Sequence, residues 1–248
     1  LPTPEKTMRS PGTPAATAAV TRGMTVVSIN GVSINDNTAA GLAVINEGIF
    51  SPRDGQNYDF VLADVSGVQR SVTLRAAQIT KTPVQNVSTI DTPSGRVGYM
   101  TFNDHIDPSE GQLTAAFAQL QSQGVSDLVL DLRYNGGGYL YIASQIGYMV
   151  AGSTRTVGKT FERLQFSDRR VADTNDPDNN TPFYNVASGI ANTGTTENTP
   201  LPTLNLGRVY VLASPGTCSA SEAIVNGLRG VDVEVILVGG TTCGKPYG

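Results

Sequence analysis

The stretch DLVLDLRYNGGG, residues 127–138, joins a short and almost continuously apolar segment to a glycine-rich turn. A strand of this composition is typical of one that is buried on both faces of a sheet. Similar strands are predicted at 96–102, 208–213 and 233–238, and helical segments separate them. This alternation predicts right-handed βαβ units and a largely parallel sheet, so the predicted fold class is α/β.

The helices of this sheet are predicted from apolar spacing. In residues 107–124, Leu113, Ala116, Phe117 and Leu120 fall on one helical face, and Gly124 is a stop signal. A second helix is expected at about 140–150 and a third from the sequence CSASEAIVNGL onward. Between the second helix and the strand at 208–213 lies a long polar stretch, about 152–206, which we expect to be a functional lid or a flexible insertion.

A different pattern precedes this half of the chain. Residues 22–35, RGMTVVSINGVSIN, predict two short strands joined by an Asn-Gly turn. A helix is expected over 37–48, ending at Gly48, and two strands within 58–77 joined at Ser66-Gly67. Residues 81–92 are predicted to be a linker. The predicted domains are therefore a small, mixed α+β, β-rich module at 1–82 and a larger α/β domain at 83–248.

Composition limits the function classes. The 248-residue chain has a formal net charge of −4, 39% apolar and 15% charged residues, and a pI near 5.0. This balance argues against nucleic acid or an anionic membrane as the main partner. No apolar run reaches the ~18 residues that a spanning helix needs. Leu1 is not an initiator Met and no signal peptide is evident, so we expect a trimmed N-terminus.

Three loops are expected to meet at one edge of the sheet. Ser219 follows the strand at 208–213, Lys245 follows the strand at 233–238, and the glycine turn at 135–138 follows the strand at 128–132. In open α/β sheets the carboxyl ends of the strands are where sites form. A serine, a lysine and a glycine-rich turn are therefore predicted to lie together.

These residue types suit acyl transfer. A serine hydroxyl becomes a nucleophile when a base takes its proton, and a lysine can be that base if its amine is neutral, which an apolar setting favours. The backbone N–H of Ala220, at a helix N-terminus, and that of Gly136 or Gly137 could stabilise the oxyanion. No metal or organic cofactor is implied.

Simpler interpretations exist for each residue. Ser219 and Glu222 have capping-box spacing, which would make the serine a helix cap. The glycine turn could be a phosphate cradle, but no Walker-type lysine follows it. The single histidine, His105, lies in a predicted loop that enters a helix, and we expect it to have no direct catalytic role, either in a Ser-His-Asp triad or in a dyad with Cys218. Asp131 and Arg133 are expected to be structural.

The motifs DLVLDLRYNGGG, CSASE and GGTTCGKPYG, in this order and spacing, resemble those of the carboxyl-terminal processing peptidases, serine proteases of the S41 type. The resemblance implies a ClpP/crotonase-like catalytic domain in which Ser219 is the nucleophile, Lys245 the general base, and Ala220 with a glycine of 136–138 the oxyanion donors. It also implies cleavage of protein substrates near their C-termini. Residues 18–34 are similar to the second half of a bacterial PDZ module, which binds peptides by strand addition.

The chain departs from the family pattern at its end. Thr241-Thr242-Cys243 stands where many members have Thr-Phe, and Pro246 stands where Gly is usual. A glutamine that orients the lysine in some members would fall beyond Gly248. Because the family continues past this point, we expect a C-terminally incomplete catalytic domain, and a PDZ-like module that lacks its first strand.

The two cysteines flank the candidate dyad. Cys218 precedes Ser219, and Cys243 lies two residues before Lys245. If the loops meet, a disulfide could join them, and it would imply an oxidising compartment, periplasmic or secreted, with membrane association through a missing N-terminal segment as an option. The alternative is a pair of buried free thiols.

Three functions are compatible with these observations. The first is a serine endopeptidase with protein or peptide substrates. The second is a catalytically silent relative that binds peptides or other ligands. The third is a crotonase-like enzyme of acyl-CoA chemistry, for which the PDZ-like module has no evident role. The oligomeric state is not predicted.

Overall fold

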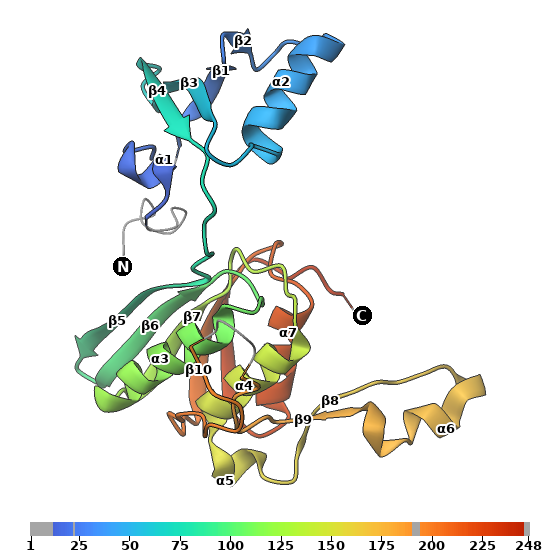
Figure 1. Ribbon diagram of the computed structural model, residues 1–248. Helices are drawn as coiled ribbons and strands as arrows, with labels where there is room; N and C mark the ends of the chain where they lie inside the picture. The colour runs from blue at the N-terminus through green and yellow to red at the C-terminus, as the bar shows by residue number, and fades with distance from the viewer. Residues whose placement is uncertain (1–11, 22, 190–193, 246–248) are drawn as a thin grey trace. The chain divides into compact units, whose positions relative to one another are not determined.

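The computed structural model describes residues 12–21, 23–189 and 194–245 (Figure 1). The chain divides into two compact units, Leu1–Lys81 and Thr82–Gly248. Each unit has its own sheet and its own cluster of buried apolar side chains.

The first unit is built on a four-stranded antiparallel sheet in the order β2-β1-β3-β4. Its strands are β1 (Thr25–Ile29), β2 (Val32–Ser33), β3 (Asn57–Ala63) and β4 (Gln69–Arg75). At the turn between β1 and β2, Asn30 and Gly31 have φ of 48° and 79°. Two successive positive φ values are what a type I′ hairpin turn requires, so the predicted Asn-Gly turn is confirmed.

Two helices accompany this sheet, α1 (Pro14–Thr17) and α2 (Ala39–Phe50). The predicted end of α2 at Gly48 is wrong, because the helix continues to Phe50. Gly48 has a packing role instead: a Cβ there would lie 2.7 Å from a side-chain carbon of Ile29. Its missing side chain allows α2 to pack closely on β1.

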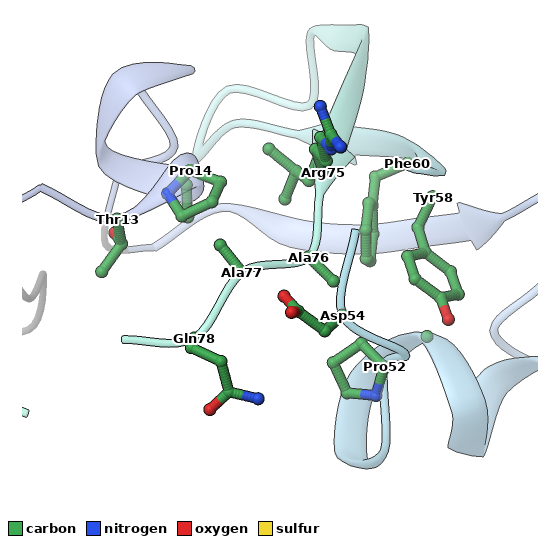
Figure 2. Close-up of a pocket in the computed structure, with 13 residues that line it drawn as sticks. Thr13, Pro14, Pro52, Asp54, Tyr58, Phe60, Arg75, Ala76, Ala77 and Gln78 are labelled. Carbon is green, nitrogen blue, oxygen red and sulfur yellow. The ribbon is translucent and has the colours of Figure 1, made fainter. Parts of the chain in front are cut away.

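A pocket of about 240 Å³ opens on the first unit (Figure 2). Its apolar wall comes from Tyr58 and Phe60 of β3, Leu74 of β4 and Pro14 of α1, and Asp54 and Arg75 also line it. Tyr58 and Phe60 belong to the buried cluster of this unit, so the pocket reaches its apolar core.

The second unit contains a five-stranded sheet in the order β11-β10-β7-β6-β5. Four of its strands are parallel, as predicted: β6 (Gly95–Phe102), β7 (Asp127–Asp131), β10 (Arg208–Ala213) and β11 (Glu234–Gly239). Leu212 of β10 lies beside Asp131 of β7, which lies beside Thr101 of β6. The carboxyl ends of these strands are therefore nearly level, and the loops that follow them share one edge.

The prediction that 81–92 is a linker is wrong for most of its length. Residues Val84–Thr92 form β5, which pairs antiparallel with β6 and gives the sheet one edge. Its side chains are mostly half-buried, so the stretch has no clear alternation of buried apolar and exposed polar positions.

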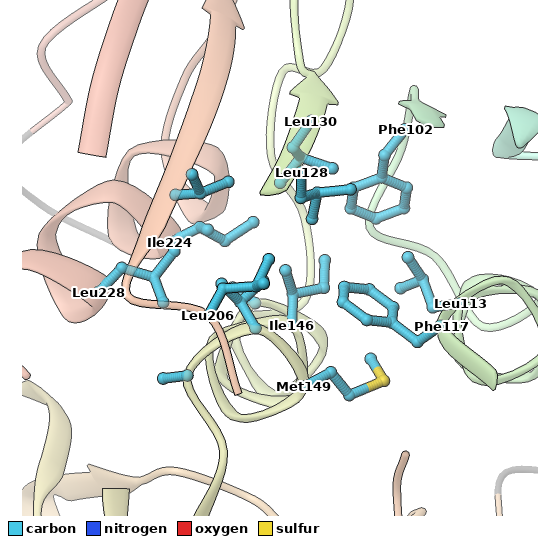
Figure 3. Close-up of a cluster of buried hydrophobic side chains, with 14 of the residues drawn as sticks. Phe102, Leu113, Phe117, Leu128, Leu130, Ile146, Met149, Leu206, Ile224 and Leu228 are labelled. Carbon is cyan, nitrogen blue, oxygen red and sulfur yellow. The ribbon is translucent and has the colours of Figure 1, made fainter. Parts of the chain in front are cut away.

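Three long helices of this unit are α3 (Ser109–Ser122), α4 (Leu140–Ala151) and α7 (Ala220–Arg229). As predicted, Leu113, Ala116, Phe117 and Leu120 of α3 are buried. In Figure 3, Phe117 of α3 lies next to Ile146 and Met149 of α4, and Leu128 and Leu130 of β7 lie above them in the view. The helices thus bury one face of the sheet.

The long stretch 152–206 is only partly an insertion. It contains α5 (Ser153–Thr156), β8 (Thr160–Arg163), η2 (Asp168–Arg170), α6 (Val171–Thr174), η3 (Pro177–Asn179) and β9 (Asn180–Pro182). β8 and β9 pair into a narrow arm that projects from the unit with α6 toward its tip (Figure 1). The base of the arm is anchored, because Phe161 and Phe183 are buried against each other with ring centroids 5.2 Å apart.

Two sets of contacts hold the stretch 152–206 against the rest of the unit. Gly147 of α4 and Gly227 of α7 both face Phe161, and a Cβ at Gly227 would lie 2.5 Å from the ring. Beyond the arm, the buried carboxylate of Glu110 accepts hydrogen bonds from the backbone N–H groups of Ser188 and Gly189. The chain after the arm is therefore tied to the N-terminus of α3.

Among the helices of the described residues, none combines the length and the apolarity that are needed to cross a bilayer.

We expect Phe161→Ala to destabilise the second unit by about 3–5 kcal/mol, because it removes a buried aromatic ring at the base of the arm. Leu164→Ala, on the same arm but at a side chain that is 45% exposed, should cost less than about 0.5 kcal/mol. Denaturant unfolding followed by circular dichroism measures both. Equal, small losses would mean that the arm is not anchored by this ring.

Candidate active site

The loops that follow β7, β10 and β11 meet at the carboxyl edge of the sheet. Thr217, between β10 and α7, donates its hydroxyl to the carbonyl of Leu132 (2.8 Å). The backbone N–H of Cys218 donates to the carbonyl of Asn135 (3.2 Å), and that of Cys243 donates to the carbonyl of Thr217 (3.0 Å). The structure thus brings together the three loops that hold the predicted site residues.

Ser219 has a strained backbone. Its φ of 56° and ψ of −119° lie in a region that a residue with a side chain rarely adopts. It occupies the N-cap position of α7, where Ser219 and Glu222 form the predicted capping box. The Ser219 backbone N–H donates to Glu222 Oε2 (2.9 Å). The capping interpretation is therefore confirmed, and it leaves a catalytic role of the serine open, because the strained backbone is not needed for a cap.

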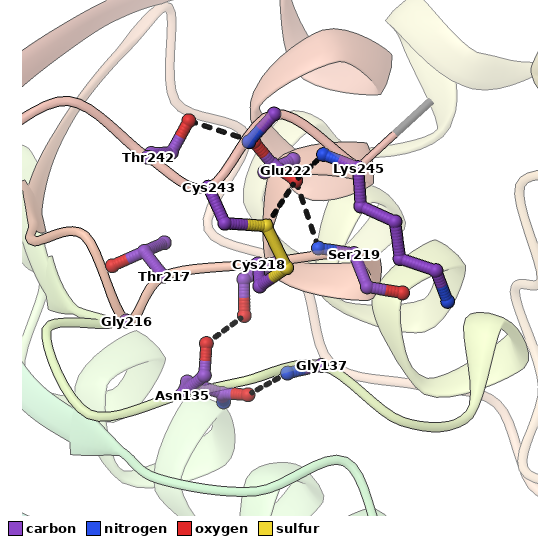
Figure 4. Close-up of a disulfide and its surroundings, with 12 residues drawn as sticks. Asn135, Gly137, Gly216, Thr217, Cys218, Ser219, Glu222, Thr242, Cys243 and Lys245 are labelled. Atoms are coloured by element: carbon purple, nitrogen blue, oxygen red, sulfur yellow. Dashed lines mark hydrogen bonds between the residues drawn. A yellow bond between two sulfur atoms is a disulfide. The ribbon is translucent and has the colours of Figure 1, made fainter. Parts of the chain in front are cut away.

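Glu222 also holds the lysine loop, a function that the sequence analysis missed. Its Oε1 accepts the Thr242 hydroxyl (2.7 Å) and the Gly244 N–H (2.7 Å), and its Oε2 accepts the Lys245 N–H (3.1 Å) (Figure 4). Burial acts to raise the pKa of Glu222, but these bonds outweigh it, and the pKa lies below its ordinary value. The carboxylate is ionised at neutral pH.

The two cysteines form the hypothesised disulfide. Cys218 and Cys243 are bonded, with their Cα atoms 5.2 Å apart, so the alternative of free thiols is wrong. A cysteine-histidine dyad with Cys218 is excluded for the same reason. With Glu222, these residues place three potential metal-ligand atoms within 4.8 Å, but two sulfurs bonded to each other cannot act as thiolate ligands.

The glycine loop lies directly against Ser219. Gly137 has φ of +101°, and a Cβ there would lie 2.7 Å from Ser219 Cβ and 3.0 Å from the backbone nitrogen of Ala220. Only glycine fits without displacing one of the two segments. At Gly136, in contrast, no atom lies within 4 Å of where a Cβ would be.

Asn135 organises this loop from inside the unit. It is fully buried, its amide donates to the carbonyl of Phe102 (3.0 Å), and its Oδ1 accepts the Gly137 N–H (3.0 Å). The Gly137 N–H is therefore used within the loop, which leaves Gly136 as the better candidate of the two glycines that the sequence analysis named. Within the described residues, neither the Gly136 nor the Ala220 N–H has a hydrogen-bond acceptor.

Lys245 departs from one expectation. Its side chain is exposed rather than set among apolar groups, and no hydrogen bond joins it to Ser219 among the described residues. Figure 4 shows the two side chains extending in the same direction from neighbouring loops, next to the glycine loop. The loops are thus positioned together, but the apolar setting expected for Lys245 is not found among the described residues.

His105 is buried beneath the glycine loop. Its Nδ1 lies 2.9 Å from Asn135 Oδ1, and its backbone N–H donates to the Gly137 carbonyl (3.2 Å). Burial lowers the pKa of His105 to about 4, although its bonds to Asn135 and Gly137 and the charge of Asp104 oppose the shift. The imidazole is therefore neutral at pH 7 and supports the loop from behind.

Asp131 and Arg133 pair with each other at the end of β7. Arg133 donates two hydrogen bonds to the buried Asp131 carboxylate (2.9 and 2.7 Å), and the Tyr99 hydroxyl donates a third (2.8 Å). Burial acts to raise the pKa of Asp131, but these donors outweigh it and the pKa is lowered. The pair stabilises the strand end from which the glycine loop starts.

We expect the stability of the second unit to fall as the pH drops from about 6.5 to about 4, because His105 is protonated in the unfolded chain over this range but not in the folded one. The loss attributable to His105 is at most about 3 kcal/mol. His105→Gln, which does not titrate, should flatten this part of the stability–pH curve in denaturant unfolding. Parallel curves for the two proteins would contradict the assignment.

Comparisons with known proteins point to one family. The sequence profile of peptidase family S41 matches residues 96–247, more than half of the chain. A Staphylococcus aureus protein named as a probable CtpA-like serine protease is 26% identical over 172 residues, covering 67% of this chain and 33% of that protein. The chloroplastic C-terminal processing peptidase of Tetradesmus obliquus is 26% identical over 235 residues, covering 89% of this chain and 43% of that protein.

A solved structure is similar in fold. The crystal structure of a Bacteroides fragilis S41 protease superposes with a TM-score of 0.64 at 26% identity, covering 95% of this chain and 58% of that one. The chain thus spans about a third to two fifths of the length of the curated relatives named above.

Proposed function

The chain belongs to peptidase family S41, and from this premise we propose that it carries the catalytic residues of a serine endopeptidase that cleaves protein substrates toward their C-termini. In this proposal Ser219 is the nucleophile, Lys245 is the general base, and the N–H groups of Ala220 and Gly136 bind the oxyanion. The C-terminal preference is taken from the name of the Tetradesmus relative.

The observation that carries the proposal is the conformation of Ser219. A non-glycine residue at φ 56° and ψ −119° is unfavourable, and such residues are concentrated at functional sites, where the surrounding structure holds them. Here the bond from the Ser219 N–H to Glu222, the disulfide and the contact with Gly137 supply that support. A serine that serves only as a helix cap typically has an extended, unstrained backbone, which Ser219 does not have.

The oxyanion site follows from the same turn. A peptide carbonyl attacked by the Ser219 hydroxyl would develop negative charge beside the N-terminus of α7, where free N–H groups point outward. The Ala220 N–H lies there, and the glycine loop approaches within contact distance of it.

Lys245 would become an effective base when substrate covers it. Lys245 is exposed on the loop beside Ser219, so an extended peptide bound over this edge would exclude water from the amine and favour its neutral form. Part of the activation of Lys245 as a general base therefore depends on substrate binding.

We assign peptide binding to the first unit, as a PDZ-like module. Its support is the antiparallel sheet with the tight β1–β2 turn, the helix α2 beside it, and the apolar pocket of Figure 2. Extended peptides bind such modules by adding a strand. The disulfide suits an oxidising compartment, so the proposed location is extracytoplasmic.

A second candidate is a catalytically silent, peptide-binding relative. The exposed side chain of Lys245 and the absence of a hydrogen bond between it and Ser219 in the described chain favour this candidate. The peptidase cleaves bound peptides and the silent relative only binds them. Variants of Ser219 and Lys245 can therefore distinguish the two.

In the full-length protein, Ser219→Ala and Lys245→Ala should each lower casein cleavage by about 10⁴-fold or more, with circular dichroism spectra and unfolding midpoints close to those of the wild type. Ser153→Ala and Lys159→Ala, at exposed positions on and beside α5, are matched controls that should retain activity. Folded wild type that binds peptides without cleaving them would support the silent relative instead.

The glycine loop offers a second test. Gly137→Ala places a Cβ against Ser219 and should lower kcat/KM by about 100-fold or more, since small displacements of reacting groups are costly. Gly136→Ala keeps its N–H and meets no atom within 4 Å, so its kcat/KM should stay near that of the wild type. Equal effects of the two substitutions would contradict the proposed geometry.

A further inference from the structure

We propose that the Cys218–Cys243 disulfide is a redox switch of the catalytic site: the peptidase is competent with the bond formed, and reduction by a dithiol separates Lys245 from Ser219. The inference rests on the proposed function, because it concerns the regulation of that same pair of residues. The reaction is balanced by the reductant, which supplies two electrons and two protons, becomes a disulfide itself, and leaves two thiols on the protein.

The position of the bond carries the argument. It is the one covalent link between the segment that ends in Ser219 and the segment that ends in Lys245, apart from the chain itself. Cys218 is half-buried and Cys243 is exposed, so a small dithiol or a reductase can reach the bond. Accessible disulfides of this kind are the ones that serve regulation.

Breaking the bond forces a movement. Two sulfur atoms that are no longer bonded must move apart to van der Waals contact, so either Cys218 or Cys243 has to shift. Cys218 has little room, because its carbonyl oxygen lies 2.9 Å from where a Cβ of Gly137 would be, and its N–H is bonded to Asn135. Cys243 is itself exposed, as are Gly244 and Lys245 after it. The shift therefore falls on the segment that carries Lys245.

In the reduced state, the Cys243 thiol would have a hydrogen-bond acceptor close by. Cys243 Sγ lies 3.4 Å from Glu222 Oε2, a contact in which the disulfide sulfur has no hydrogen to donate. After reduction, the Cys243 thiol can donate to this carboxylate, which already accepts the N–H groups of Ser219 and Lys245. A new donor at Oε2 competes with these two bonds, so reduction also weakens the non-covalent link between the segments.

A larger distance between Lys245 and the Ser219 hydroxyl should slow catalysis. General-base catalysis needs Lys245 within hydrogen-bond reach of the Ser219 hydroxyl, and a displacement of about 1 Å can cost about 100-fold in rate. Reduction should lower kcat/KM by about this factor while the buried core stays folded. Reoxidation should restore activity, since no atom is lost.

The test measures casein cleavage by the full-length protein in its oxidised form, after dithiothreitol, and after reoxidation, with thiols counted in each sample. We expect a loss of about 100-fold on reduction and recovery on reoxidation. The double variant Cys218→Ala/Cys243→Ala should have the low activity of the reduced enzyme, and dithiothreitol should not change it further. This variant also controls for any effect of the reductant elsewhere in the protein.

A second measurement does not depend on activity. Amide hydrogen exchange should accelerate on reduction in residues 242–245, while the glycine loop at 135–138 keeps its protection. Reduced protein with full activity and unchanged exchange overturns the switch. Failure of the oxidised wild type to cleave casein contradicts the proposed peptidase, and the exchange experiment then still decides whether the bond controls the position of the lysine segment.

Discussion

Four hydrogen-bond donors from two loops converge on the carboxylate of Glu222, and the geometry of the candidate site depends on this convergence. One donor is the N–H of Ser219, and the others belong to Thr242, Gly244 and Lys245. Hydrogen bonds to an ionised carboxylate are stronger than neutral ones, so a single side chain at the start of α7 links the serine to the lysine segment.

The glycine loop completes this arrangement from the opposite side of Ser219. Asn135 is buried and holds the loop through its side chain, with His105 and the Phe102 carbonyl as partners. Gly137 then contacts Ser219 so closely that no side chain fits between them. The strained turn at Ser219 is thus held on one side by Glu222 and the disulfide, and on the other by a rigid loop.

Much of the second unit could be predicted because its signals are local. Apolar spacing located α3, continuous apolar runs located β7 and β10, and glycines located the turns. The linker prediction for 81–92 was wrong because pairing with β6, a tertiary contact, makes a strand of a polar sequence. For the same reason, the anchoring of 152–206 through Phe161 could not be anticipated from a stretch that is mainly polar.

The sequence by itself determined the order of the four parallel strands and of the long helices between them, the family motifs, and the candidate residues Ser219, Lys245 and Ala220 with Gly136 or Gly137. These depend on residue type and spacing, which are visible in a single chain. Only the tertiary structure decided that Glu222 links both loops, that Gly137 uses its own N–H for Asn135, and that Lys245 is exposed. These features depend on contacts between residues that are far apart in the sequence. The contacts form only when the parallel strands lie side by side and bring their carboxyl ends, with the loops that follow, to one edge of the sheet.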